Sequence, residues 1–455
     1  MKPAIGLQRR AGAILAIDVL ALAAVLATAP AAFVWLDGSR PSPLAVDSSG
    51  SGSGSAHSPG PTPSVSGVAT QAPVQTARPA TAVPTTKIVY GDGTWDSLPP
   101  MPRSLWGAAS AVLADGRVLV IGGLSGPNSA SALATVEVFD PKSNSWDAAA
   151  PMLQARAYPA AATLADGSVL VAGGSRGGVP LDGAERYFPD SGTWVSAGVM
   201  SSARTEARAT LLRDGRVLVT GGGSEAPPSY QSTNAAEIFD PATGSWTSTA
   251  PMSTARAFHT ATLLSDGEVL VTGGASIYHG SKGAVVATAE IYDPKSATWH
   301  AAARMSVARY HHVAAPLPDG RVLVAGGWAF TTNSDKSFAT AEIYDPAKNT
   351  WKATGSMATG RARGSVASLP DGRVRVVGGV DTAYRVMATA EIWDPSTGKW
   401  QPTGRLTAAV MWPALALLTT GESCWPAEPW TSELRTRRRR APYSCRPPRS
   451  DQEPR

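Results

Sequence analysis

The sequence predicts an all-β propeller, because one four-stranded unit recurs along most of the chain. The unit is clearest in residues 251–299, where apolar runs end at Asp266-Gly267 and at Gly273-Gly274. An Asp-Gly turn between apolar runs is typical of a β-hairpin, and Asp293-Pro294 marks a second turn before Trp299. Each unit therefore contributes four short antiparallel strands, a to d.

Three markers repeat with a period near fifty residues, which favours a propeller over a compact two-sheet domain. The Gly-Gly pairs begin at Gly122, Gly173, Gly221, Gly273, Gly326 and Gly378. The tryptophans are Trp95, Trp146, Trp194, Trp246, Trp299, Trp351 and Trp400, each followed six residues later by Met101, Met152, Met200, Met252, Met305, Met357 or Leu406. We expect six complete blades and an incomplete seventh, with these repeated residues in structural roles.

The repeated Gly-Gly, spaced aromatic and Trp resemble the signature of the Kelch-repeat family over residues 88–422. The resemblance implies a β-propeller with a central channel, of an exported bacterial type similar to the central domain of galactose oxidase. That enzyme's copper site uses a Tyr cross-linked to a Cys, and the two cysteines here, Cys424 and Cys445, lie in no repeat. The resemblance therefore implies the fold without that chemistry, and we expect no cofactor.

The N-terminal segments predict export. Residues 1–10 carry three basic residues and no acid, and the apolar run 11–36 is longer than the ~20 residues that span a membrane. Ala29-Pro-Ala31 and the cost of Asp18 in a spanning helix count against the anchor and leave a cleaved signal sequence open as the alternative. Both interpretations place the propeller outside the cytoplasm, and we expect a single-pass cell-membrane protein.

Residues 37–87 are rich in Ser, Pro, Gly and Thr and are predicted to be a disordered stalk. The net charge of +5 belongs to the chain ends, with +3 in residues 1–10 and +4 in residues 423–455, which leaves −2 for residues 11–422. A near-neutral propeller gives no electrostatic reason to expect nucleic acid. We expect a monomer.

The repeats disagree most at one position, two residues after the Arg that opens strand a. Its occupants are Tyr158, Glu206, Phe258, His311 and Arg363, with Trp412 in the seventh repeat. The inserts between strands b and c also vary and carry Tyr230, Tyr278, His279, Lys282, Trp328, Phe330, Asp335, Tyr384 and Arg385. Antiparallel pairing places both sets on one face, which is the candidate site. Drift among loops would produce a similar pattern.

Three histidines, His259, His311 and His312, fall near the start of strand a in adjacent units. Imidazoles grouped in this way bind Zn or Cu in other proteins. Three ligands without a repeated carboxylate are a weak metal signal, so we interpret these histidines as polar rim residues and predict no metal site.

Two functions remain open. The preferred one is a non-catalytic binding module for a cell-surface glycan or protein, with ligand-binding residues Tyr158, Glu206, Phe258, His259, Tyr278, His311, Trp328, Arg363 and Tyr384. The alternative, implied by exported Kelch propellers, is a sugar mutarotase in which Glu206 is the base and His311 or Arg363 the acid or anion clamp. Because a rim site is exposed, Ala at Glu206, Trp328 and Arg363 is expected to leave folding nearly intact.

The repeat breaks off after Glu422, where a second apolar strand is due. One added base after that codon restores an apolar run, a Gly-Gly and an Asp, so we hypothesise a frameshift or sequencing error that truncates the seventh blade. Strand d of that blade would come from around Trp95. The residues from 423 to 455, with the basic run 437–440, would then be out of frame and disordered.

Overall fold

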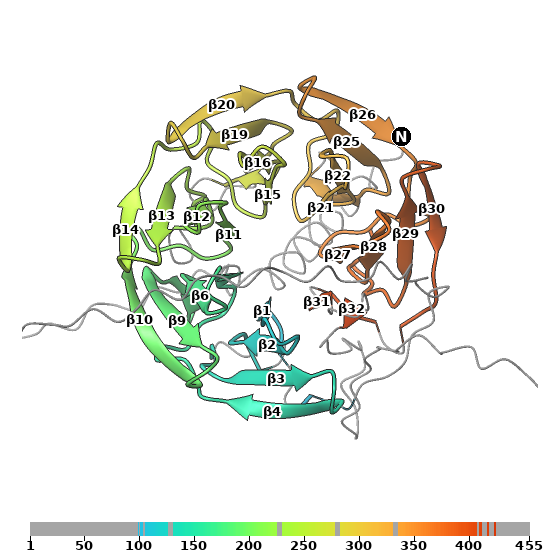
Figure 1. Ribbon diagram of the computed structural model, residues 1–455. Coiled ribbons are helices and arrows are strands. Elements are labelled where there is room, and N and C mark those ends of the chain that lie inside the picture. The colour runs from blue at the N-terminus through green and yellow to red at the C-terminus, as the bar shows by residue number, and fades with distance from the viewer. Residues whose placement is uncertain are drawn as a thin grey trace, which may run out of the picture. The chain divides into compact units, whose positions relative to one another are not determined.

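The computed structural model describes residues 99, 101–102, 105–125, 131–224, 230–277, 283–330, 335–406, 409–411, 416–417 and 423–424. All of them belong to one compact unit that includes residues 89–455. Six four-stranded antiparallel sheets follow one another in chain order within it, and each forms one blade (Figure 1). The prediction of six complete blades is confirmed.

In every blade the strands cross the sheet in chain order, from a to d. Blades 1 to 3 contain β1 (Ala109–Val112), β2 (Val118–Ile121), β3 (Val136–Asp140), β4 (Ser145–Ala149); β5 (Ala160–Thr163), β6 (Val169–Ala172), β9 (Gly183–Phe188), β10 (Thr193–Val199); and β11 (Arg208–Leu211), β12 (Val217–Thr220), β13 (Ala236–Asp240), β14 (Ser245–Ser248). Blades 4 to 6 contain β15 (Thr260–Leu263), β16 (Val269–Thr272), β19 (Ala289–Asp293), β20 (Thr298–Ala302); β21 (Val313–Pro316), β22 (Val322–Ala325), β25 (Ala341–Asp345), β26 (Thr350–Thr354); and β27 (Ser365–Ser368), β28 (Val374–Val377), β29 (Ala390–Asp394), β30 (Lys399–Pro402).

Short hairpins extend three of the connections between strands b and c. They are β7 (Ser175–Arg176) with β8 (Val179–Pro180), β17 (Ala275–Ser276) with β18 (Ala284–Val285), and β23 (Trp328–Phe330) with β24 (Asp335–Ser337). The a strands β1, β5, β11, β15, β21 and β27 contact one another in succession, so they form the inner wall of the ring. The segments that lie at the ends of this wall are the turns into strand a and the connections that follow strand b.

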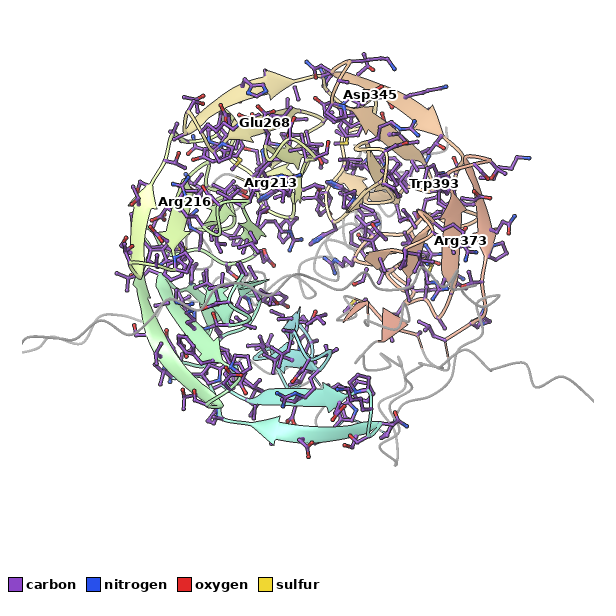
Figure 2. The ribbon with its side chains drawn as sticks, viewed as in Figure 1. Arg213, Arg216, Glu268, Asp345, Arg373 and Trp393 are labelled. Atoms are coloured by element: carbon purple, nitrogen blue, oxygen red, sulfur yellow. The ribbon has the colours of Figure 1, made fainter. Side chains whose placement is uncertain are left out.

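The hydrophobic core lies between blades. The b strands are largely apolar on both faces because each is sandwiched between neighbours, and all four residues of Val118–Ile121 are buried. Leu119 and Ile121 of blade 1 pack in one cluster with Val169 and Val171 of blade 2. Trp393 packs in the corresponding cluster between blades 5 and 6 (Figure 2).

The repeated tryptophans have the structural role expected of them, because they join neighbouring blades. Trp299 is half-buried, and its ring packs at 5.0 Å from Tyr292, which is only 1% exposed. The Trp299 Nε1–H donates to the carbonyl of Ala250 in the preceding blade at 2.7 Å. The same bond recurs at other junctions, as from Trp351 to Ala303 at 2.6 Å. The Trp period therefore reports the spacing between blades.

Buried ion pairs recur in blades 2 to 6, and the sequence analysis did not identify them. They join the Arg two residues before the variable position to the Glu in strand c: Arg156–Glu185, Arg204–Glu237, Arg256–Glu290, Arg309–Glu342 and Arg361–Glu391. Arg256 Nη1 also donates to the carbonyl of Gly273 at 2.9 Å, and Glu290 accepts the backbone N–H of Ser253 at 2.6 Å. Arg256 and Glu290 therefore each have hydrogen-bond partners besides one another, as a buried ion requires.

The seventh blade is represented by β31 (Ala416–Leu417), which pairs with β32 (Ser423–Cys424) and contacts β1. Leu417 pairs with Ser423 as Leu263 pairs with Val269 in blade 4, so the hairpin has the register of a normal a–b pair. Ser423 and Cys424 form a strand, which corrects the expectation of disorder for these two residues. The frameshift hypothesis stays a prediction.

Strand d of the seventh blade was expected around Trp95, which lies outside the described residues. The carbonyl of Pro99 nevertheless accepts a hydrogen bond from Trp146 Nε1 at 3.0 Å, which is the position Ala250 holds for Trp299. The segments 1–10, 11–36, 37–87 and 425–455 also lie outside the described residues. Among those described, no helix has the length and hydropathy needed to cross a membrane.

We predict that Arg256→Ala destabilises the protein by about 3 to 5 kcal/mol, because it leaves Glu290 buried without its charge partner. The matched control is Arg321→Ala, whose partner Asp319 is exposed, and it should cost less than about 1 kcal/mol. Denaturant unfolding of both variants measures the difference. Equal losses in the two variants would refute a structural role for the buried pair.

Candidate functional site

The variable position is held in the same backbone conformation in every blade. Gly107, Tyr158, Glu206, Phe258, His311 and Arg363 all have a left-handed backbone, with φ between 52° and 66°. We call these six the channel-mouth residues. Each lies two residues before the start of an a strand of the inner wall. Such a conformation costs a non-glycine residue on the order of 1 kcal/mol and persists only where the surroundings impose it.

Hydrogen bonds between blades impose this conformation. The Tyr158 N–H donates to the carbonyl of Gly107 at 2.7 Å, and the Glu206 N–H donates to that of Tyr158 at 3.1 Å. His311 and Arg363 donate in the same way to the preceding blade, at 3.1 and 3.0 Å. The backbone is thus fixed by the ring while the side chain differs from blade to blade, which is an arrangement suited to building a site.

The connections leaving strand b lie beside these residues, as predicted. Ala157 forms a β-bridge with Ser175, Thr205 with Gly223, and Tyr310 with Trp328. Each bridge joins the residue before a channel-mouth residue to the segment that follows the Gly-Gly pair. Tyr278, His279, Lys282 and Trp412 lie outside the described residues, as do the side chains of Phe330 and Asp335.

The candidate residues are buried, which corrects the expectation of an exposed rim. Trp328 is 0% exposed, Arg363 2%, and Glu206 8%. Tyr158 and Tyr384 are half-buried. Replacing a fully buried Trp by Ala removes about 3 to 5 kcal/mol of stability, so the expectation that Ala variants leave folding intact is wrong.

Glu206 is the centre of the polar contacts. Its Oε2 accepts a hydrogen bond from the Tyr230 hydroxyl at 2.8 Å, whereas its Oε1 has no partner among the described residues. The indole Nε1 of Trp328 likewise has none in the described part of the chain. Buried polar atoms are nearly always hydrogen-bonded, so each of these two atoms has capacity left for a bond to a ligand or a water.

Aromatic rings surround these polar groups. The Arg363 guanidinium lies over the Trp328 ring at 4.9 Å, and the Trp328 and Tyr384 rings are 4.9 Å apart. His311 packs against Phe258 with ring centroids 4.2 Å apart, and Tyr230 stacks near Phe258 at 6.4 Å. The structure therefore brings together the predicted residues of blades 3 to 6 in one cluster.

Burial shifts the ionisation of this cluster. It raises the pKa of Glu206 from 4.5 to about 7, while the Tyr230 hydrogen bond and the charges of Arg363 and Arg208 act in the opposite direction. Burial, and then the charges of Arg363 and Arg208, hold the pKa of His311 well below its usual range. His311 is consequently neutral at pH 7 and a poor proton donor, which argues against the acid role expected for it.

The other two histidines connect blades. His259 Nε2 lies 2.9 Å from the Thr220 hydroxyl of blade 3, and His312 Nε2 lies 2.9 Å from the Thr260 hydroxyl of blade 4. His259 is 0% exposed and its Nε2 is engaged with Thr220, so its ring belongs to the junction between blades 3 and 4. Within the described ranges no three His, Cys, Asp or Glu side chains form a group that could hold a metal ion.

Sequence comparison identifies the repeats. Residues 106–153, 156–201, 208–253 and 309–358 match the Kelch motif. The chain is a Kelch-repeat β-propeller. An F-box/kelch-repeat protein of Arabidopsis thaliana is 35% identical over 116 residues, which are 25% of this chain and 29% of that protein.

Two solved structures share the fold of this Kelch propeller. One is a fungal alcohol oxidase of the AA5 family in complex with copper, with a TM-score of 0.61 at 19% identity over 74% of this chain and 72% of that one. The other is YjhT, with a TM-score of 0.53 at 16% identity over 68% of this chain and 99% of that one. At these identities the likeness concerns the fold alone.

Glu206 should give the Kelch propeller a measurable pH dependence. A carboxyl whose pKa is higher in the folded protein than in the unfolded chain binds more protons when folded, so stability falls as pH rises from 4.5 to about 7. Over that interval we predict that the wild type loses about 3 kcal/mol relative to Glu206→Gln. Urea unfolding across this pH range tests it, and contributions from the buried histidines cancel in the difference.

Parallel stability profiles of the wild type and Glu206→Gln would contradict this account of Glu206. Asp319→Asn is the matched control, since Asp319 is exposed and paired on the surface with Arg321.

Proposed function

We propose that this Kelch propeller is a binding module for a small carbohydrate, which it holds at the channel mouth. The observation that carries the proposal is the unfilled hydrogen-bonding capacity of Glu206 Oε1 and Trp328 Nε1, both buried. One atom accepts and the other donates, and a sugar hydroxyl can serve either. Small-ligand sites commonly combine an aromatic lining with a few fixed polar groups.

Burial favours a small ligand over a protein partner. Protein interfaces place a broad surface in contact with solvent before binding, whereas Trp328 and Arg363 are almost fully enclosed. The aromatic rings of Tyr230, Phe258 and Tyr384 offer faces against which the C–H groups of a sugar pack. A glycan end that inserts into the channel mouth fits this arrangement better than a folded domain does.

We predict that Glu206→Gln weakens binding of the cognate sugar roughly tenfold to a hundredfold, because a hydrogen bond to a charged group contributes about 1.5 to 3 kcal/mol. Trp328→Phe should weaken it through loss of the indole N–H while keeping an aromatic ring. Titration of the full chain against a panel of monosaccharides and short glycans measures the loss. Arg321→Ala, on an exposed turn, is the control that should bind normally.

Normal binding of an identified sugar by both Glu206→Gln and Trp328→Phe would refute the channel-mouth site.

We further propose that the propeller is displayed outside the cytoplasm by the apolar segment 11–36, so that it meets cell-surface glycans. The support is the length of that segment and the basic residues before it. Release of the chain from membranes by alkaline carbonate would argue for a cleaved signal sequence instead.

A second candidate function is a sugar mutarotase or related acid–base enzyme. The observation that favours it is the pKa of Glu206 near 7, because a group that titrates at the working pH transfers protons most effectively. Tyr230, hydrogen-bonded to the carboxylate, and Arg363 replace His311 as the accompanying groups. The Glu206–Tyr230 pair was not anticipated, although both residues stood out by their variation.

An enzyme of this kind would accelerate anomer exchange of a free reducing sugar, and Glu206→Gln should abolish the acceleration. Exchange spectroscopy by NMR measures it. A sugar that binds at the channel mouth with an unchanged exchange rate excludes the enzyme and leaves the binding module.

A further inference from the structure

The turns that join strands c and d share one backbone conformation. In each blade one residue of this turn has a left-handed backbone: Asn144, Gly192, Gly244, Ala297, Asn349 and Gly398. Gly and Asn tolerate this conformation, and Ala does so poorly. Ala297, with φ of 56°, is the exception among these six turns.

The neighbouring blade shows what an Asn does at this position. Asn349 Oδ1 accepts hydrogen bonds from the Ala303 N–H of blade 4 at 2.7 Å and from the Tyr344 hydroxyl at 2.9 Å. It thereby fills the junction between blades 4 and 5. Ala297 cannot do this at the junction between blades 3 and 4, where Tyr292 corresponds to Tyr344.

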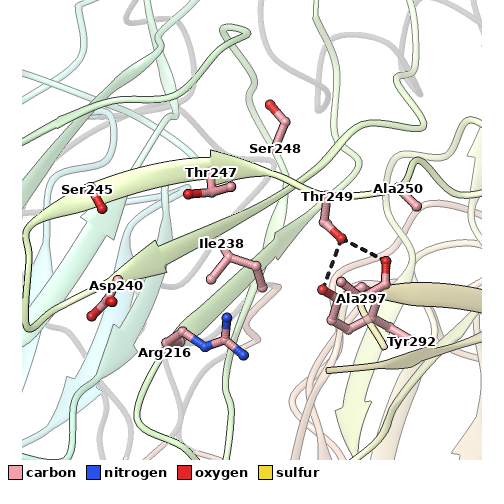
Figure 3. A pocket seen from close by; sticks show the side chains of 10 residues that line it. All are labelled: Arg216, Ile238, Asp240, Ser245, Thr247, Ser248, Thr249, Ala250, Tyr292 and Ala297. Carbon is pink, nitrogen blue, oxygen red and sulfur yellow. Dashed lines mark hydrogen bonds between the residues drawn. The ribbon is translucent and has the colours of Figure 1, made fainter. Parts of the chain in front are cut away.

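A cavity of about 340 Å³, open to the surface, lies at that junction (Figure 3). The Thr249 hydroxyl takes over part of the missing role, since it lies 3.0 Å from the Tyr292 hydroxyl and 3.2 Å from the Ala297 carbonyl. A second cavity of about 420 Å³ on the same side shares Arg216 and is also lined by Arg213 and Glu268 (Figure 2). Cavities that bind small molecules have volumes of roughly 300 to 1,000 Å³.

The lining of the first cavity combines a small apolar floor with alternating donors and acceptors. Ile238 is paired with Thr247 across the sheet, and Asp240 with Ser245, so these four side chains share the face toward blade 4. Arg216 uses Nε and Nη2 to bind Asp214, and within the described residues its Nη1 has no protein partner. Tyr292, only 1% exposed, also lines this cavity, with its hydroxyl next to that of Thr249.

The charges indicate a neutral ligand. Arg216 is already paired with Asp214, and Asp240 adds a negative charge to the same cavity, which disfavours a free anion. The Arg216 guanidinium disfavours a cation for the opposite reason. Hydroxyl groups, in contrast, can meet Arg216, Asp240 and Thr247 in turn without an uncompensated charge.

We propose that the junction between blades 3 and 4 is a second binding site, which takes one neutral monosaccharide unit. The sugar hydroxyls bind Arg216, Asp240 and the hydroxyls of Thr247 and Tyr292, and its C–H groups contact Ile238 and Ala297. Ala at position 297 keeps the cavity open. The site is separate from the channel mouth and does not depend on the function proposed there.

Ala297→Asn and Ala297→Gly form a matched pair for the test. Both relieve the left-handed backbone, so neither should lower the midpoint of thermal unfolding, but only Asn can fill the cavity as Asn349 does. The full chain carrying 3-fluorotyrosine is titrated with methyl α-glucoside, methyl α-galactoside and methyl α-mannoside. The ¹⁹F resonance of Tyr292, assigned with Tyr292→Phe, reports this site alone, and that of Tyr230 reports the channel mouth.

We expect at least one of the three glycosides to shift the Tyr292 resonance in the wild type and in Ala297→Gly. The shift should vanish in Ala297→Asn and weaken at least tenfold in apparent affinity in Arg216→Ala. An unmoved Tyr292 resonance with all three glycosides overturns the proposal. So does an equal shift in Ala297→Asn, and a glucuronate ion that binds more tightly than glucoside overturns the choice of a neutral ligand.

Discussion

The buried Arg–Glu pairs are the constraint on which the rest of the propeller depends. Arg256 precedes the channel-mouth residue Phe258 by two positions, and its guanidinium binds both Glu290 in strand c and the carbonyl of Gly273 after strand b. Glu290 in turn accepts the N–H of Ser253 in the incoming loop. The loop, strand b and strand c are therefore fixed relative to one another inside a blade. Contacts within the blade thus hold the entry into strand a, in addition to the hydrogen bonds from the neighbouring blade.

That fixed entry explains how a repeat can carry a site. Backbone hydrogen bonds between neighbouring blades, such as Glu206 to Tyr158, hold each channel-mouth residue in one conformation irrespective of its side chain. The fold consequently imposes no single residue type there. One blade supplies a carboxyl, another a guanidinium, and others aromatic rings, all directed to the same end of the ring. A single buried carboxyl among such neighbours acquires a pKa near neutrality.

On the side of the turns between strands c and d, the repeats differ in whether a side chain fills the junction between two blades. There Asn349 closes a junction by bonding to two blades, and Ala297 leaves the equivalent junction open. Ala297 has no bridging side chain and, unlike Gly at three other turns, adopts the left-handed conformation with a Cβ. A residue that is locally unsuitable but structurally tolerated is a reason to look for function.

The sequence by itself determined the number of blades, the order of strands and the face on which the variable residues gather, because these follow from a local period and from antiparallel pairing. It also singled out Glu206, Trp328 and Arg363. Only the tertiary structure decided that these residues are buried, that Tyr230 reaches Glu206 across 24 positions, and that the Trp residues join blades. The burial of these side chains and their contacts depend on how neighbouring blades pack. The sequence of a single repeat does not specify how closely the next blade packs against it.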